Sequence, residues 1–164
     1  MPQVVYPELT IVWPKEQDSP MAWLTVSTVP ASVGESKVKF FVSGKFEDRL
    51  NIRRIQDALR TMGYEITEDW TYHEYSDKGY PVDYAISDVK GIFRSDIYVG
   101  RFVADYNYKG SLVELGIALC NGNLCMIIGH AIDDCIFVDY PLIRQFEDDE
   151  EFLNNIKFYV SGEG

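Results

Sequence analysis

The alternation of short apolar runs with helical patterns is the feature of this sequence that most restricts its fold. From Lys37 onward, strand-like and helix-like segments follow one another in a regular order. Such alternation is typical of a mainly parallel sheet with a helix in each crossover. We therefore expect an α/β domain with a doubly wound, mainly parallel sheet, in a Rossmann-like or flavodoxin-like three-layer arrangement.

Short apolar or β-branched runs beside turns predict the strands of this sheet. The first run ends at Ser43-Gly44, and the fifth is the shortest and least regular. The predicted strands are Val38 to Val42, Tyr64 to Thr67, Asp96 to Phe102, Leu124 to Gly129 and Cys135 to Val138.

Apolar residues at helical spacing predict the helices. The predicted helices run from about Asp48 to Met62, from about Val82 to Arg94, from Ser111 to Cys120, and through Glu147 to Asn155. Gly63 supplies the stop of the first helix. The predicted buried stripes are Leu50, Ile52, Ile55, Leu59 and Met62 in the first helix, and Ala85, Val89, Ile92 and Phe93 in the second.

Residues 1–36 differ from the rest, because their β-prone runs are broken by Pro14, Pro20 and Pro30. This pattern indicates a strand-forming extension or hairpin attached to a main domain at residues 37–164. We assign the extension no chemistry.

Charge and motif content exclude several classes of function. The formal net charge of -11, with 26 acids against 15 bases, argues against a general nucleic-acid binder. Neither a dinucleotide fingerprint nor a P-loop motif occurs, and the three cysteines lack zinc-site spacing. We expect no nucleic-acid or membrane partner, no metal and no cofactor. A reduced compartment suits the cysteines, and the cytoplasm is the expected location.

Three loops are expected to share one edge of the sheet. They are Ser43 to Glu47, Phe102 to Lys109 and Gly129 to Asp134, and each follows a predicted strand. Open parallel sheets bind ligands beyond the carboxyl ends of their strands. The sequence therefore places a candidate site there, whereas His73 and His130 have no triad or metal context and are expected to be loop residues.

Glu114 is the first candidate for chemistry, because it is the one charged side chain between Gly110 and Leu119. A carboxylate in apolar surroundings is costly unless it is paired or hydrogen-bonded. One explanation is a capping box, with Ser111 as N-cap and Glu114 three residues later. The other is a nucleophile or electrostatic stabiliser near a helix start. The sequence leaves both open.

Asp88 is the second candidate, because it flanks the apolar stripe of its helix beside Tyr84 and Ile92. Taken alone, it fits an ordinary helix-surface acid. Together with Glu114 it would supply the two carboxyl groups that glycosidic cleavage uses. Gly44 and Lys45 fit either an anion cradle or an ordinary strand-to-helix turn.

Three segments resemble the nucleoside 2-deoxyribosyltransferase family, which includes 2-deoxynucleoside 5-monophosphate N-glycosidases. The segments are Phe40 to Arg49, Asp88 to Asp96, and Gly110 to Gly116, which carries a Gly-x-x-x-Glu-Leu-Gly element. The resemblance covers roughly Lys37 to Gly129.

The resemblance implies cleavage or transfer of the N-glycosidic bond of a 2-deoxyribonucleoside or its 5-monophosphate. Glu114 would form a covalent deoxyribosyl ester, and Asp88 would assist departure of the base by proton transfer. The family's transferases often carry tyrosine at the position of Phe40 and an acid at that of Tyr108, and the nearby Asp105 is the candidate to replace that acid. The substrate-binding positions that the resemblance implies are Phe40, Ser43, Gly44, Lys45, Asp96, Asp105, Tyr108, Gly110 and Ser111.

Two other functions stay open at this point. One is cleavage of a nicotinamide dinucleotide by an NAD-type glycohydrolase, since related sheet folds also use one glutamate for that reaction. The other is a catalytically silent nucleotide-binding module, which the departures at Phe40 and Tyr108 would suit. The resemblance also implies a homo-oligomer of unspecified size.

Overall fold

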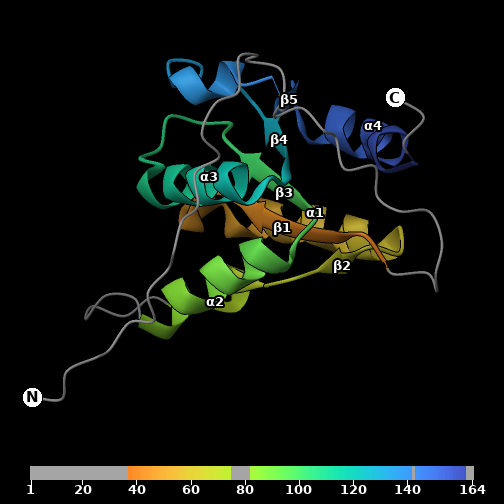
Figure 1. Ribbon diagram of the computed structural model, residues 1–164, viewed down its shortest axis with the longest axis horizontal. Coiled ribbons are helices and arrows are strands. Elements are labelled where there is room, and N and C mark those ends of the chain that lie inside the picture. Colours follow the sequence, from red (N-terminus) through yellow and green to blue (C-terminus); the bar gives the residue numbers. More distant parts are fainter. Residues whose placement is uncertain (1–36, 75–81, 142, 162–164) are drawn as a thin grey trace, which may run out of the picture. The chain divides into compact units, whose positions relative to one another are not determined.

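The computed structural model describes residues 37–74, 82–141 and 143–161, and the extension predicted at residues 1–36 lies outside them. Short 3-10 helices join some of the helices and strands within this part of the chain (Figure 1). The elements in chain order are β1 (Lys39–Ser43), η1 (Phe46–Asp48), α1 (Arg49–Thr61), β2 (Glu65–Ile66), η2 (Trp70–Tyr72), α2 (Val82–Arg94), β3 (Ile97–Arg101), α3 (Lys109–Asn121), β4 (Leu124–Ile128), η3 (Ile136–Asp139), β5 (Ile143–Phe146) and α4 (Asp149–Ser161).

The described strands form one sheet in the order β2-β1-β3-β4-β5, and every neighbouring pair is parallel. In the central register Val42 lies opposite Val99, which lies opposite Met126. The middle strands are buried on both faces, as expected for a parallel sheet covered by helices. The predicted doubly wound, flavodoxin-like α/β fold is confirmed.

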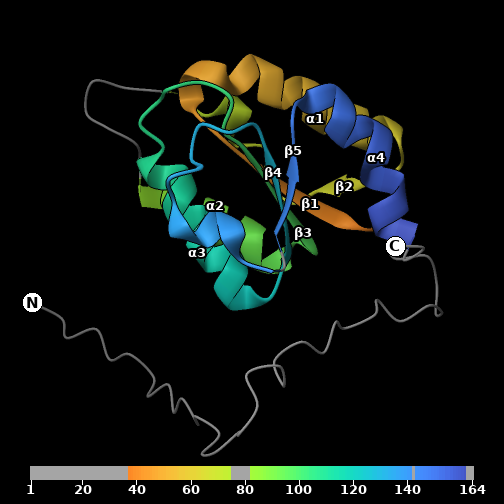
Figure 2. The same ribbon diagram turned by 90° about the horizontal axis from the view of Figure 1, so that it is seen from above.

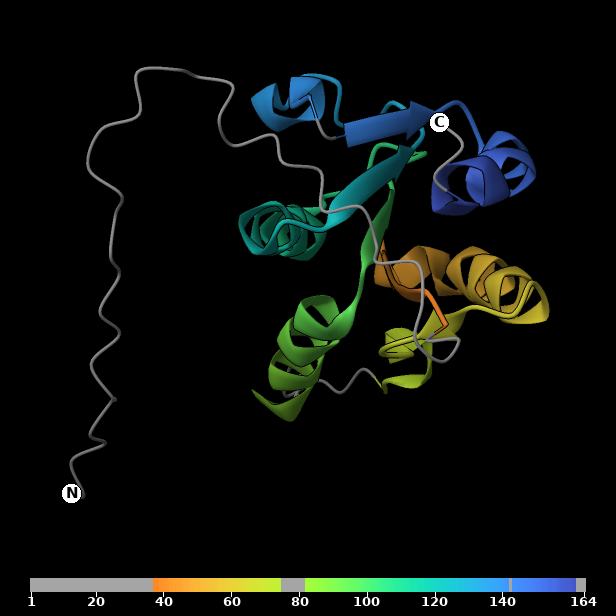
Figure 3. The same cartoon turned by 45° about the vertical axis from the view of Figure 1, so that its right-hand side comes forward.

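The sheet lies between two pairs of helices. Helices α2 and α3 cover one face, while α1 and α4 cover the other (Figures 2 and 3). Helix α1 packs through Ile52, Ile55 and Leu59, which are fully or almost fully buried. Leu50, predicted for the same stripe, is exposed instead, because it lies one residue after the helix start and points away from the sheet's apolar face.

The predicted stripe of α2 is wrong at three of its four positions. Ile92 is buried, whereas Ala85, Val89 and Phe93 are exposed. The helix touches the sheet near its end, where a Cβ on Gly91 would lie 3.0 Å from Cδ2 of Phe41 in β1. The glycine permits this close approach, and the earlier turns of α2 therefore face a cleft and solvent instead of the core.

The predicted fifth strand at Cys135 to Val138 is also wrong. That segment contains the 3-10 helix η3, and the fifth strand is β5, at Ile143–Phe146. Strand β5 pairs only with β4 among the described strands, so it is an edge strand. Its Ile143 and Phe146 are buried while the two residues between them are exposed, so it lacks the continuous apolar run of a central strand.

A buried ion network joins the end of β3 to the starts of α1 and α4. Arg101, the last residue of β3, contacts Asp48 at the start of α1 and Asp149 at the start of α4. Its Nε lies 2.8 Å from Asp149 Oδ1 and its Nη2 lies 3.0 Å from Asp149 Oδ2. This network fixes both helix starts against the carboxyl end of the central strand. Among the described helices, none has the length and apolar character needed to cross a membrane.

Candidate active site

A cleft of about 810 Å³ opens at the carboxyl ends of β1 and β3. Its walls come from the β1–α1 loop, the η2 segment, and the helices α2 and α3. This is the edge at which the sequence places the candidate site, and the volume lies in the range of small-molecule pockets.

Glu114 lies in the second turn of α3 and faces this cleft. The buried Ser43 hydroxyl, at the end of β1, donates a hydrogen bond to Glu114 Oε2. Burial raises the pKa of Glu114, while the hydrogen bond from Ser43 lowers it. The last residue of one strand thus orients the carboxylate of a neighbouring helix.

The capping-box interpretation of Glu114 is wrong. Helix α3 starts earlier than predicted, with Tyr108 at the N-cap position and no side-chain cap. Ser111 lies inside the helix, where its hydroxyl donates to the carbonyl of Gly44 at 2.9 Å. This hydrogen bond attaches α3 to the β1–α1 loop. Glu114 does not cap the helix, and it faces the cleft.

A fully buried tyrosine lies beneath this pair. The Tyr98 hydroxyl, from β3, donates to the Ser111 carbonyl at 3.0 Å. Burial raises the pKa of Tyr98 well above its ordinary value, the charge of Glu114 raises it further, and a hydrogen bond with Ser43 lowers it. The Tyr98 side chain therefore stays uncharged, and its hydrogen bonds help to hold Ser43 and Ser111 in place.

Asp88 reaches the same cleft from α2. Its Oδ1 is buried and has no hydrogen-bond partner among the described residues. Burial and, next, the charge of Glu114 raise the pKa of Asp88 to about 7, although His73 lowers it. The two carboxyl groups therefore face one cleft with different surroundings, one held by a donor and the other not.

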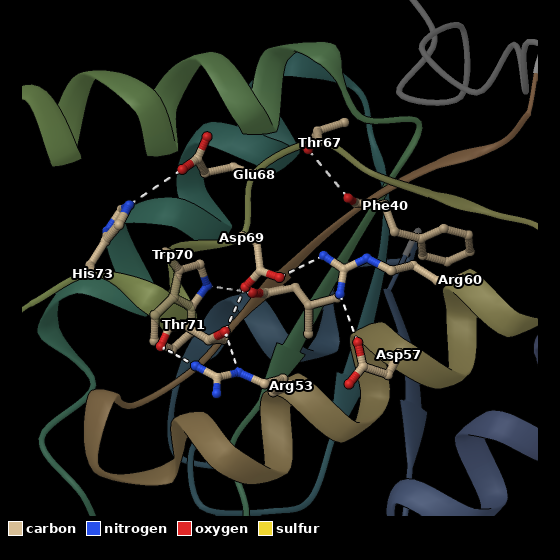
Figure 4. A network of polar contacts seen from close by, with 11 residues as sticks. Phe40, Arg53, Asp57, Arg60, Thr67, Glu68, Asp69, Trp70, Thr71 and His73 are labelled. Atoms are coloured by element: carbon tan, nitrogen blue, oxygen red, sulfur yellow. Dashed lines mark hydrogen bonds and ion pairs between the residues drawn. The ribbon is translucent and has the colours of Figure 1, made fainter.

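The aromatic side of the cleft is formed by Trp70, His73 and Tyr84. The rings of His73 and Tyr84 stack with centroids 3.8 Å apart and an interplanar angle of 7°. His73 Nε2 lies 3.3 Å from Glu68 Oε1 (Figure 4). Sequence reasoning missed this side, although the concentration of aromatic residues directly after a strand was a usable signal.

Polar contacts anchor the segment that carries Trp70 and His73 to the body of the domain (Figure 4). Arg60 binds Asp69 at 2.6 Å, and Arg53 donates to the Thr71 carbonyl at 2.7 Å. The indole N–H of Trp70 donates to the Val42 carbonyl at 2.6 Å. This wall of the cleft is therefore held in place from α1 and β1.

Gly44 and Lys45 form the rim next to Ser43. A Cβ on Gly44 would lie 2.2 Å from Ile52 Cδ1, so a larger residue would require the Ile52 side chain to move. Lys45 Nζ donates to the Asn107 carbonyl at 2.9 Å and lies 3.8 Å from Glu47 Oε2. The lysine thus bridges the β1–α1 and β3–α3 loops across the edge of the cleft.

Tyr108 and Gly110 complete the α3 side of the cleft. The Tyr108 ring is buried, and its hydroxyl donates to the Ala104 carbonyl at 2.9 Å. Gly110 has open space where a Cβ would lie. The backbone therefore comes to the cleft surface at the start of α3.

Four residues that the sequence associates with substrate do not line this cleft, and one of them, Ser43, is connected to it through Glu114. Phe40 is fully buried in β1 beside Tyr64. Asp96 precedes β3, at the end opposite the cleft, and accepts the Lys39 backbone N–H at 2.8 Å. Asp105 lines a separate cavity of about 430 Å³ with His130 and Glu147. The motif around Asp96 is contiguous in sequence, but the length of β3 separates it from the site.

Comparison with known proteins identifies the fold through structure alone. No family model matches the sequence, and no curated protein matches it either. A 2-deoxyribosyltransferase from Bacillus psychrosaccharolyticus superposes with a TM-score of 0.56 at 18% identity, covering 71% of this chain and 91% of that one. This chain has the 2-deoxyribosyltransferase fold.

Two other solved structures share this fold. The CMP N-glycosidase of Clostridium botulinum matches with a TM-score of 0.53 at 15% identity, covering 74% of this chain and 98% of the glycosidase. A conserved protein from Enterococcus faecalis V583 matches with a TM-score of 0.52 at 14% identity, covering 76% and 99%. At such identities the likeness establishes the fold, and the chemistry has to be argued from the cleft.

Proposed function

We propose that this chain cleaves or transfers the N-glycosidic bond of a 2-deoxyribonucleoside or its 5-monophosphate. The observation that carries the proposal is the pair of carboxyl groups, Glu114 and Asp88, which face one cleft, the first with a hydrogen-bond donor and the second with none among the described residues. Pairs of acids whose surroundings separate their pKa values are how enzymes divide nucleophile and acid roles. A glycosidase and a deoxyribosyltransferase of the same fold support the choice of bond.

In the first step, the ionised Glu114 attacks the anomeric carbon of the sugar. The hydrogen bond from Ser43 favours the ionised carboxylate and fixes its direction. The bond from that carbon to the base nitrogen breaks, and its electron pair goes to the base. Asp88, with a pKa raised to about 7, is protonated in about half of the molecules at pH 7, and this form transfers its proton to the departing base.

In the second step, the sugar leaves Glu114. Ionised Asp88 takes a proton from water or from an acceptor base, whose oxygen or nitrogen attacks the anomeric carbon. The ester bond breaks, and both carboxyl groups return to their starting states. Water as acceptor gives a hydrolase, and a second base gives a transferase.

The proposed placement of the substrate follows from the positions of the two acids. The base lies on the α2 side, where Asp88 delivers its proton and where the stacked rings of His73 and Tyr84 line the cleft. Aromatic faces suit a planar base. The sugar lies over Glu114 and Ser43, and its 5-end points toward Gly44, Lys45 and the backbone at Gly110.

The test is a chromatographic assay of base release and base exchange. The protein is incubated with the four deoxynucleosides, their monophosphates and CMP, with and without an acceptor base. Exchange identifies a transferase, release alone identifies a hydrolase, and a requirement for phosphate identifies the substrate class. A nicotinamide dinucleotide is assayed in parallel, and release of nicotinamide without any deoxynucleoside cleavage would contradict the proposal.

The variants Glu114→Gln and Asp88→Asn link the activity to the cleft. We expect Glu114→Gln to lower turnover by at least about 1,000-fold, because no nucleophile remains to form the ester. Asp88→Asn should lower it by about 100-fold or more, through loss of the proton donor. Glu150→Gln, on the exposed side of α4, is the matched control and should keep full activity. Full activity in Glu114→Gln would refute the assignment.

A further inference from the structure

His73 is a partly buried ionisable residue to which the proposed reaction assigns no chemistry. Its ring lines the cleft, and its backbone N–H donates to the Trp70 carbonyl at 2.9 Å, which ties it to η2. The ring stacks on Tyr84, with centroids 3.8 Å apart. Tyr84 and Asp88 lie four residues apart on α2, so their side chains are neighbours on one face of that helix. The stack therefore holds the imidazole close to Asp88.

Glu68 lies on another side of the imidazole. His73 Nε2 lies 3.3 Å from Glu68 Oε1, and Figure 4 shows the two side chains pointing toward each other. Only 16% of the His73 side chain and 22% of the Glu68 side chain are exposed, so solvent screens this pair less than a surface pair. The carboxylate fixes the direction in which the ring points.

The charge beside Asp88 changes when His73 gains or loses a proton. The pair of Glu68 and His73 is neutral with a protonated imidazole and negative with a neutral one. Glu68 and Glu114 are the described acids whose charges act on Asp88, and the charge of His73 opposes them. Glu74, which follows His73 in the chain, is exposed. Because histidine ordinarily changes charge between about pH 5 and 8, the field at Asp88 varies with pH in that range.

We infer that His73, held by Glu68, is a positioning residue that controls when Asp88 carries the proton used in the proposed reaction. A protonated His73 favours ionised Asp88. A neutral His73 leaves the negative charges of Glu68 and Glu114, which favour protonated Asp88. Asp88 therefore keeps its proton to a higher pH than it would beside a fixed positive charge. The inference rests on the proposed function, because that reaction is what makes Asp88 a proton donor.

Carbon-13 NMR of the Asp88 carboxyl group tests the inference without any substrate. The Asp88 signal is assigned by its loss in Asp88→Asn. We expect His73→Phe to raise the midpoint of the Asp88 titration and His73→Lys to lower it, so that the two midpoints differ by about one pH unit or more.

Two further variants separate charge from packing. His73→Phe keeps a ring against Tyr84, whereas His73→Gln removes both the ring and the charge. An electrostatic effect predicts an upward shift of the Asp88 midpoint in both. His130→Phe, at the other histidine of the chain, is the matched control, because His130 lines the separate cavity, and it should leave the midpoint unchanged. Circular dichroism melts check that each variant is folded.

The pH profile of kcat connects the titration with the reaction. Asp88 acts in its protonated form in the first step, so activity falls as the pH rises through the pKa of Asp88. This falling limb should move to higher pH in His73→Phe and to lower pH in His73→Lys. A merely structural role of His73 would lower kcat in both variants without moving the limb in opposite directions.

Two results would overturn the inference. One is an Asp88 midpoint that stays the same in all the folded His73 variants, and the other is a shifted midpoint with an unmoved limb. If His73→Lys does not fold, the comparison of His73→Phe and His73→Gln with the unmodified protein still decides the matter. Failure of the proposed function has a different sign, because the unmodified protein would then release no base, whereas the carboxyl titration requires no turnover.

Discussion

At the residue scale, Glu114 and Asp88 differ in the partners that surround them. Glu114 accepts a hydrogen bond from Ser43, which offsets part of the cost of its burial. Asp88 has a buried oxygen without such a donor among the described residues. Burial raises the pKa of both acids, and the donor at Glu114 is the difference on which their proposed roles rest.

Asp88→Asn should make the protein more stable at high pH. The pKa of Asp88 is raised from 3.8 to about 7 in the folded state, so the folded protein keeps a proton that the unfolded chain releases. The free energy of unfolding therefore falls as pH rises between these two values. Asparagine does not ionise, so the variant does not lose stability in this way as the pH rises. We expect the variant to be more stable by about 1 kcal/mol near pH 8, after allowance for solvent screening.

Chemical denaturation at a series of pH values measures this difference. The stability of the variant and that of the unmodified protein should converge as the pH falls below 3.8, where Asp88 becomes protonated in the unfolded chain as well. A difference that does not change with pH would show that Asp88 has an ordinary pKa in the folded protein.

Ser43→Ala should move the acidic limb of the activity profile to higher pH. The hydroxyl favours ionised Glu114, so its loss raises the pKa of the nucleophile. We expect kcat to fall about tenfold near pH 6 and less above pH 8. A pH–rate profile measures the shift, and Ser161→Ala, near the end of α4, is the control. An unshifted limb would show that Ser43 does not influence the ionisation of Glu114.

At the scale of elements, Arg101 connects three parts of the fold that border the site. It joins the end of β3 to the starts of α1 and α4, and α1 in turn anchors the η2 wall through Arg53 and Arg60. A change at one strand end should therefore affect the stability of the whole domain.

Arg101→Met should destabilise the domain by about 3 kcal/mol at neutral pH, because Asp48 and Asp149 would be left without their cation. Urea denaturation measures the change. Arg144→Met, on the exposed edge strand β5, should change stability by less than about 0.5 kcal/mol. Equal effects of the two substitutions would contradict the role given to Arg101.

The central elements could be predicted because their signals are local. The bounds of α2 were predicted at the residues where the structure has them, and β1, β3 and β4 are continuous apolar runs. Strand β5 could not be found in this way, because Arg144 and Gln145 face solvent on an edge. The apolar segment that follows Cys135 was predicted as the fifth strand, but it forms η3.

The candidate site was predictable where it follows strand ends. Ser43, Asp88 and Glu114 meet at the expected edge of the sheet. The aromatic wall required tertiary information, since His73 and Tyr84 are brought together from two elements and stack face to face. Asp96 is an error of another kind. Its motif is continuous in sequence, but Asp96 lies at the end of β3 that is far from the cleft.

At the scale of the whole chain, acids outnumber bases 26 to 15, and the formal net charge is -11. Self-repulsion of this size opposes the compact state and is screened by salt. Raising sodium chloride from about 0.01 M to about 0.15 M shortens the Debye length from about 30 Å to about 8 Å. We expect Tm to rise by a few degrees over this range.

Differential scanning calorimetry measures the shift, and potassium chloride serves as the control for a specific sodium effect. A fall in Tm with either salt would mean that screened attractions, such as those of Arg101, outweigh the net repulsion.

The two acids belong to the bodies of helices, whereas Lys45 and Asn107, which meet across the rim, belong to loops. In the proposed reaction, the acids that break the bond and the rim that faces the 5-end of the sugar thus belong to separate segments of the chain. A designer could exchange the rim loops to seek a new group at the 5-end of the sugar, and the spacing of the acids would be preserved by helix packing.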